Sequence, residues 1–119
     1  MEIFVESDKY QIYNEYERVF LKLKETSKII NIGDFYGDPQ VVLISEDEKY
    51  CVMGGAGIIV YYLNEPYEEY NYNIQSKQWK EWGRVNSDDT IWVEDIFLVD
   101  DKQIEIETED MQKLIFDVY

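Results

Sequence analysis

The chain has 119 residues, 26 acidic and 11 basic, which give it a formal net charge of −15. With no histidine and one cysteine, the sequence excludes a histidine-based catalytic pair, an imidazole-ligated zinc site and an internal disulfide. A hydrophobic content of 45% places it outside the disordered class, and its length predicts one domain over residues 1–119.

Charge and cysteine use indicate the compartment and the kind of partner. The acidic residues Glu2, Glu6 and Asp8 leave no signal-peptide pattern, and the uncharged residues 51–64 are too few to span a bilayer. A lone Cys51 suits a reducing compartment, so we expect a cytoplasmic protein. The negative charge opposes binding to nucleic acid or membrane and favours a basic protein partner. The alternative is that acidity only keeps an aromatic-rich protein in solution.

The first part of the chain has an ambiguous pattern. Residues 3–5 form a short apolar run typical of a strand. Over residues 10–24, apolar residues recur at helical spacing, and Ser7 or Asp8 would cap a helix. Val19, Leu21 and Leu23 also alternate as in a strand, so both structures fit. We predict a helix for the first part of this segment.

The middle of the chain reads as three consecutive strands over residues 41–44, 50–53 and 58–63. A polar turn at 45–48 and the glycine-rich turn at 54–57 separate them, which is typical of an antiparallel meander. The last two runs lack alternation, so we expect both of their faces to be covered.

The C-terminal third predicts three further strands, at 91–99, 104–107 and 114–119, the last two forming a hairpin. Together these patterns predict an α+β fold, a mostly antiparallel β-sheet (meander) with one amino-terminal helix.

No motif indicates catalysis. The Gly54–Gly57 run lacks a following helix and a nearby lysine, so a hairpin turn explains it better than a phosphate-binding loop. The Asp47/Lys49 and Asp100/Lys102 pairs faintly resemble metal-dependent nuclease sites, but fragments of this kind arise by chance in so acidic a chain. Cys51 lies in an apolar strand and reads as a buried structural thiol. We therefore expect no enzyme activity, no cofactor and no metal.

The most distinctive stretch, residues 64–73, mixes carboxylates with tyrosines, and two tryptophans follow closely. Tyrosine and tryptophan are typical interface anchors, and carboxylates pair with lysine and arginine on a partner. The predicted partner-binding residues are Glu65, Tyr67, Glu68, Glu69, Tyr70, Trp79, Trp82, Asp88 and Asp89. The alternative is that Tyr70, Tyr72 and Ile74 alternate along a strand and fill the core. A second acidic block, residues 88–110, would join the first if the sheet brought them together.

Five stretches of the middle region carry a resemblance to a known group: residues 33–39, 54–61, 65–68, 78–82 and 91–96. In these the chain resembles small acidic bacterial immunity proteins associated with polymorphic or contact-dependent toxins. The resemblance implies a non-catalytic protein that binds and neutralises a cognate toxin domain, such as a basic nuclease. The alternative is a small-ligand-binding or regulatory domain with an aromatic-lined pocket. The sequence leaves the oligomeric state open.

Overall fold

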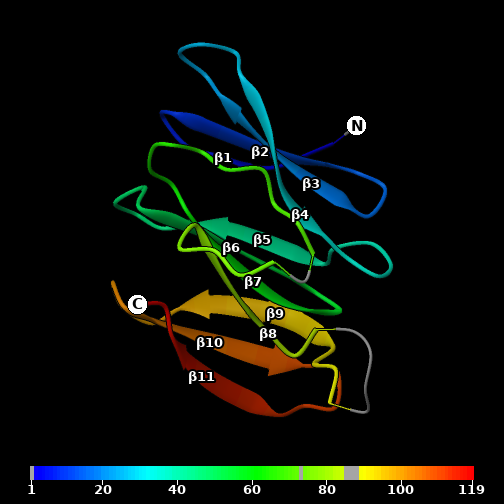
Figure 1. Ribbon diagram of the computed structural model, residues 1–119. Coiled ribbons are helices and arrows are strands. Elements are labelled where there is room, and N and C mark those ends of the chain that lie inside the picture. Colours follow the sequence, from blue (N-terminus) through cyan, green and yellow to red (C-terminus); the bar gives the residue numbers. More distant parts are fainter. Residues whose placement is uncertain (1, 73, 85–88) are drawn as a thin grey trace.

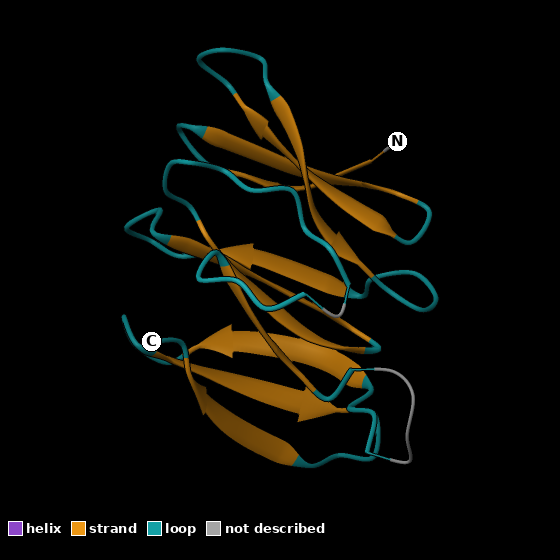
Figure 2. Cartoon of the chain, in the orientation of Figure 1, coloured by secondary structure: helices purple, strands orange, loops and turns teal. Residues whose placement is uncertain are grey.

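The computed structural model describes residues 2–72, 74–84 and 89–119, which form eleven strands and no helix (Figures 1 and 2). The strands make three antiparallel sheets, each a meander of consecutive strands. The N-terminal sheet contains β1 (Glu2–Glu6), β2 (Tyr10–Glu15), β3 (Arg18–Leu23) and β4 (Ile29–Asp34). The central sheet contains β5 (Val41–Ile44), β6 (Tyr50–Gly55), β7 (Gly57–Tyr62) and β8 (Trp79–Trp82). The C-terminal sheet contains β9 (Val93–Leu98), β10 (Gln103–Thr108) and β11 (Lys113–Asp117).

The predicted α+β class is wrong, because the segment expected to be helical is the β2–β3 hairpin. Ile12 and Leu21 face each other across the two strands and are fully buried on the inner face. Tyr13 and Phe20 face each other on the outer face and stack with ring centroids 5.5 Å apart. Because large apolar side chains occupy both faces of the hairpin, their spacing along the chain imitates that of a helix. No described residue therefore belongs to a helix that could cross a membrane.

The central sheet lies between the other two, and Figure 1 shows the three layers. Every residue of β6 and β7 is buried, which confirms the expectation that both faces of these strands are covered. Alternate side chains point to opposite sides, so Met53 and Ile59 join the core with the N-terminal sheet, and Val52 and Val60 the core with the C-terminal sheet. The fold thus has two hydrophobic cores that share one sheet.

The predicted meander and C-terminal strands are confirmed as β5–β7 and β9–β11. The glycine-rich stretch is a hairpin turn as expected, with Gly57 in the left-handed region at a φ of 96°. Gly54 has a packing role, since a Cβ there would lie 2.7 Å from Val93 Cγ1 of the C-terminal sheet. Cys51 is fully buried, as expected from its apolar neighbours.

The strand connections gather at two ends of the three-layer stack. The right-hand end in Figure 1, here called the aromatic end, holds the connections β2–β3, β4–β5, β6–β7, β8–β9 and β10–β11. Contacts hold them in a row: Phe35 N–H donates to the Glu17 carbonyl (2.9 Å), Ala56 pairs with Trp92, and Glu109 N–H donates to the Trp92 carbonyl (2.9 Å). The opposite end, here called the lysine end, holds the connections β1–β2, β3–β4, β5–β6, β7–β8 and β9–β10.

Candidate functional site

The predicted partner-binding residues lie in several places. Glu65, Tyr67, Glu68 and Glu69 lie on the β7–β8 connection, and the three carboxylates are exposed. This connection runs along β4, where Glu69 accepts a hydrogen bond from the Asn31 amide (2.7 Å). Tyr67 is half-buried, and its hydroxyl lies 2.9 Å from that of Tyr10. These residues therefore combine an acidic surface with contacts that fix the connection.

The predicted aromatic anchors are largely inside the protein. Tyr70 and Trp79 are only 4% and 5% exposed, and their rings pack together in the core with the N-terminal sheet. Trp82 is half-buried against Phe116, with ring centroids 4.9 Å apart. These rings offer little area to a partner.

Of the acidic pair predicted after β8, Asp89 lies at the opposite end of the stack from the β7–β8 connection. Asp89 is exposed at the aromatic end, and Asp88 lies outside the described residues. The second acidic block is itself divided, with Asp100 and Asp101 at the lysine end and Glu109 and Asp110 at the aromatic end. The fold therefore does not gather the acidic residues into one face.

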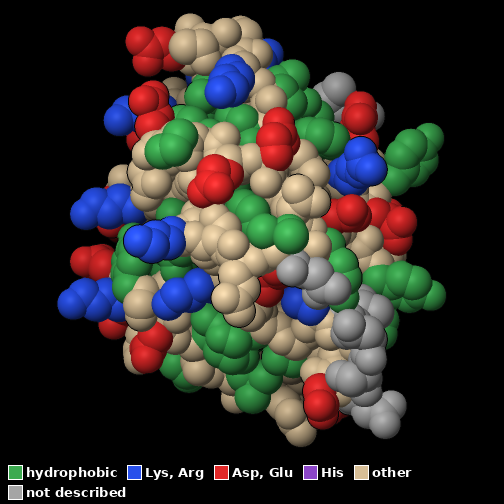
Figure 3. Space-filling model, in the orientation of Figure 1, with side chains coloured by type: hydrophobic (Ala, Val, Ile, Leu, Met, Phe, Trp, Pro, Cys, Tyr) green, Lys and Arg blue, Asp and Glu red, His purple; other side chains and the backbone are tan. Residues whose placement is uncertain are grey.

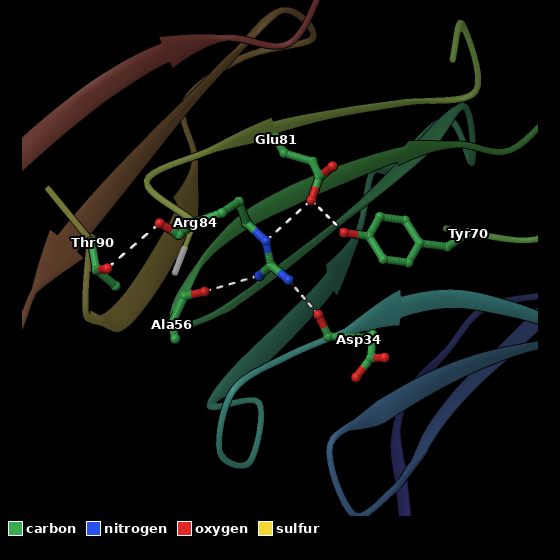
Figure 4. Close-up of polar contacts among 6 residues, drawn as sticks. All are labelled: Asp34, Ala56, Tyr70, Glu81, Arg84 and Thr90. Atoms are coloured by element: carbon green, nitrogen blue, oxygen red, sulfur yellow. Dashed lines mark hydrogen bonds and ion pairs between the residues drawn. The ribbon is translucent and has the colours of Figure 1, made fainter. Parts of the chain in front are cut away.

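The best-connected polar cluster surrounds Arg84 and is drawn in Figure 4. The guanidinium donates hydrogen bonds to the carbonyls of Ala56 (2.9 Å) and Asp34. Its Nε lies 3.1 Å from Glu81 Oε1, an ion pair whose angle is not that of a hydrogen bond. The Tyr70 hydroxyl donates to the same carboxylate oxygen.

This cluster is structural in character. Arg84 joins the end of β4 to the β6–β7 turn, and its guanidinium lies 4.6 Å from the centre of the Phe35 ring. Burial, then the hydrogen bond to Glu81, raises the pKa of Tyr70 far above its ordinary value, so the phenol stays protonated as a donor. With its charge paired to Glu81 and both terminal nitrogens of its guanidinium bonded to backbone carbonyls, Arg84 links the N-terminal and central sheets at the aromatic end.

Much of the surface charge has no basic counterpart within reach. Among the described residues, ion pairs join only Lys24 to Glu6 and Arg84 to Glu81. Other carboxylates accept hydrogen bonds from hydroxyl groups. The Ser45 hydroxyl donates to the Asp47 carboxylate, and this bond lowers the pKa of Asp47. Asp47 therefore remains ionised at neutral pH, and most of the described acidic residues are exposed to solvent.

Four large hydrophobic side chains are exposed at the aromatic end, and the predicted site included none of them. They are Tyr16 (89% exposed), Tyr36 (67%), Trp92 (46%) and Met111 (87%). A signal was present in the sequence, since Tyr16 stands between Glu15 and Glu17 and Met111 follows Glu109 and Asp110. Large apolar residues flanked by acids on a turn are more often surface residues than core residues.

The hollows of the surface are shallow. One at the aromatic end, of about 460 Å³, is lined among others by Ile91, Trp92, Leu114, Glu109 and Asp110. Another, of about 510 Å³, lies beside β8 and includes Trp79 and Trp82. Among residues 2–72, 74–84 and 89–119, no three acidic or cysteine side chains come together as a metal site. Burial raises the pKa of the Cys51 thiol to about 12, so it stays protonated and unreactive.

Comparison with protein-family models, curated proteins and solved structures gives no match for this chain. The features of the molecule that bear on its function are its charge, its exposed aromatic residues and its three-sheet scaffold.

Proposed function

We propose that this is a non-catalytic, immunity-type protein that binds a basic protein, its cognate toxin domain, and neutralises it by covering its surface. The observation that carries the proposal is the surplus of negative charge: the chain has 26 acidic and 11 basic residues, a net charge of −15. A field of this sign attracts positively charged proteins and speeds their association, while it repels nucleic acid and anionic membranes.

The scaffold suits binding without a large rearrangement. Two cores fix the central sheet on both faces, and the Arg84 cluster fixes the connections at one end. A rigid surface loses little conformational entropy when a partner docks, which favours tight binding. The sequence resemblance to small acidic immunity proteins supports a toxin as the partner, and the free, buried Cys51 supports action in the cytoplasm.

A second candidate function rests on the hollow beside β8. It is lined in part by Trp79 and Trp82, and the buried Trp79 Nε1 has no hydrogen-bond acceptor among the described residues. A small molecule carrying an acceptor and an aromatic or apolar body would suit such a place. Under this alternative, Trp82→Ala abolishes ligand binding, and added salt has little effect.

Affinity capture tests the first proposal. The tagged protein is immobilised, exposed at low salt to lysate of its source organism, and washed with rising salt. We expect one predominant basic protein that elutes as salt screens the acidic surface. The purified eluate is then assayed as a toxin with and without the protein. Retention of nothing at low salt, or of a protein whose activity is unaffected, would refute the proposal.

A further inference from the structure

We propose that the aromatic end is the surface that receives the basic partner, with Tyr16, Tyr36 and Trp92 as its anchors. This inference rests on the proposed function and adds the place of binding, which differs from the acidic β7–β8 connection favoured by the sequence.

The first argument is the exposure of these side chains. Seven large hydrophobic side chains elsewhere in the described residues are 42–56% exposed, and Trp92 (46%) falls in that range. Tyr16, Tyr36 and Met111, at 89%, 67% and 87%, are more exposed than any of these. Each of the four belongs to a connection of the aromatic end. Clustered aromatic residues with this exposure are typical of interaction surfaces, where tyrosine and tryptophan provide most of the binding energy.

The backbone gives a second argument. Tyr16 and Met111 have left-handed conformations, with φ of 54° and 68°, in tight turns. A residue with a bulky side chain is disfavoured there, whereas glycine or asparagine adopts this conformation readily. The comparable positions at the lysine end are Ser27 and Glu48, which are polar. Folding alone would favour a different residue at position 16, so the tyrosine is retained for a contact made by its side chain.

Backbone contacts hold the segments that carry the proposed anchors. The Glu17 carboxylate accepts a hydrogen bond from the Gly37 amide, which fixes the loop that carries Tyr36 beside the turn that carries Tyr16. Trp92 is held by its pairing with Ala56. Tyr36 and Trp92 are thus carried by backbone that is already held in place before a partner arrives, as an efficient docking surface requires.

Charge identifies the partner as basic. The connections of the aromatic end carry Glu17, Asp38, Asp89, Glu109 and Asp110. Arg84, the basic residue described within them, is engaged with Glu81, and two exposed bases, Arg18 and Lys113, begin the strands that follow the β2–β3 and β10–β11 connections. The connections of the lysine end carry ten acidic residues, but six lysines are interleaved with them: Lys9, Lys24, Lys28, Lys49, Lys77 and Lys102. In Figure 3 most of the basic side chains lie towards the left-hand, lysine end, with acidic ones among them, while hydrophobic side chains project at the right beside acidic ones and a basic one.

The hollow at this end has the chemistry to hold one lysine or arginine of the partner. Its apolar lining, Ile91, Trp92 and Leu114, suits the methylene stem of such a side chain. The carboxylates of Glu109 and Asp110 at the same hollow suit the charged head. A second copy of this chain would bring like charges together, so a basic protein fits this surface better.

Nuclear magnetic resonance locates the surface with a defined probe, a decapeptide of alternating arginine and glycine. In a titration of the 15N-labelled protein at low salt, we expect saturating shifts at the amides of Tyr16, Tyr36 and Met111 and at the Trp92 indole. Saturating shifts at the lysine end instead would overturn the inferred place of binding, while the proposal that the partner is basic would still stand. Shifts that never saturate, or concentration-dependent broadening without peptide, would also overturn it. Absence of any salt-sensitive shift would refute the proposed function itself.

A pair of variants separates binding from folding. Both Tyr16→Asn and Ser27→Asn place asparagine at a left-handed, exposed turn position, one at each end of the stack. We expect each to leave the fold intact, with Tyr16→Asn raising the melting temperature by about 3 °C because the backbone strain is relieved. Only Tyr16→Asn should weaken peptide binding, by about fivefold, through loss of an aromatic anchor. Equal peptide affinity in the two variants would contradict the assignment of Tyr16.

Discussion

Replacing Arg84 with methionine tests whether the cluster at the aromatic end holds the sheets together. The variant keeps much of the side-chain stem but leaves the carbonyls of Asp34 and Ala56 without their donor and the Glu81 carboxylate without its cation. Breaking a buried ion pair by removing one partner costs about 3–5 kcal/mol. The side chains of Arg84 and Glu81 are 12% and 18% exposed, so water offsets part of the loss and we expect the low end, about 3 kcal/mol.

The assay is urea unfolding followed by circular dichroism and tryptophan fluorescence. We expect an unchanged slope, a lower midpoint and a melting temperature reduced by about 10 °C. The matched control is Lys24→Met, which breaks the exposed pair with Glu6 and should leave the midpoint unchanged within error. In a cycle with Glu81→Gln, the two losses should be less than additive, because both variants break the same contact. An Arg84→Met loss below about 1 kcal/mol would refute the structural role, since exposed pairs already reach that value.

Three further predictions concern the core. In Gly54→Ala the new Cβ would lie 2.7 Å from Val93 Cγ1. We expect this overpacking to lower the free energy of unfolding, measured in urea, by about 1–3 kcal/mol. An unchanged free energy would mean that the C-terminal sheet shifts freely to make room. Burial raises the pKa of Tyr50 and Tyr62 to about 12, so folding favours the neutral phenols. The free energy of unfolding should be unaffected by these groups below pH 10 and should fall as the pH rises towards 12. Tyrosinate absorbance should appear together with the loss of the circular dichroism signal. Complete formation of tyrosinate before the protein unfolds would contradict this prediction. The Cys51 thiol should react with a thiol reagent only upon unfolding, and rapid labelling of the native protein would contradict its burial.

Local patterns were enough to predict the strands of the central and C-terminal sheets. The apolar runs of β6 and β7 lack alternation because both faces are covered, and the Ile104–Glu107 alternation reflects one covered face in β10. The helix predicted for the first part of residues 10–24 is wrong because Tyr13 and Phe20 form an apolar pair on the outer face, while the alternation of Val19, Leu21 and Leu23 does correspond to a strand, β3. Such a pair can lie on the second face of a hairpin or along the apolar side of a helix. Which of the two forms depends on contacts with distant parts of the chain, which the short-range spacing of residues does not encode.

The candidate surface was harder to predict for a different reason. The sequence shows the high acidity and aromatic content, but which aromatic side chains reach solvent depends on how three sheets stack. Tyr70 and Trp79 lie in an acidic stretch yet fill the core, whereas Tyr16 lies in an apolar pattern yet projects from a turn. Contacts such as that between Glu17 and Gly37 join segments distant in sequence, and only the fold brings them together.

The central claim, that a basic partner docks at the aromatic end, is tested most directly by capture with two charge-matched variants. Asp38→Asn with Glu109→Gln removes two exposed carboxylates at the aromatic end, and Glu25→Gln with Glu65→Gln removes two at the lysine end. Net charge is equal in both, so a general electrostatic effect would change them alike. We predict that the partner captured by the unaltered protein is lost from the first variant at clearly lower salt than from the second. Equal retention by the two variants, or earlier loss from the second, would contradict the account.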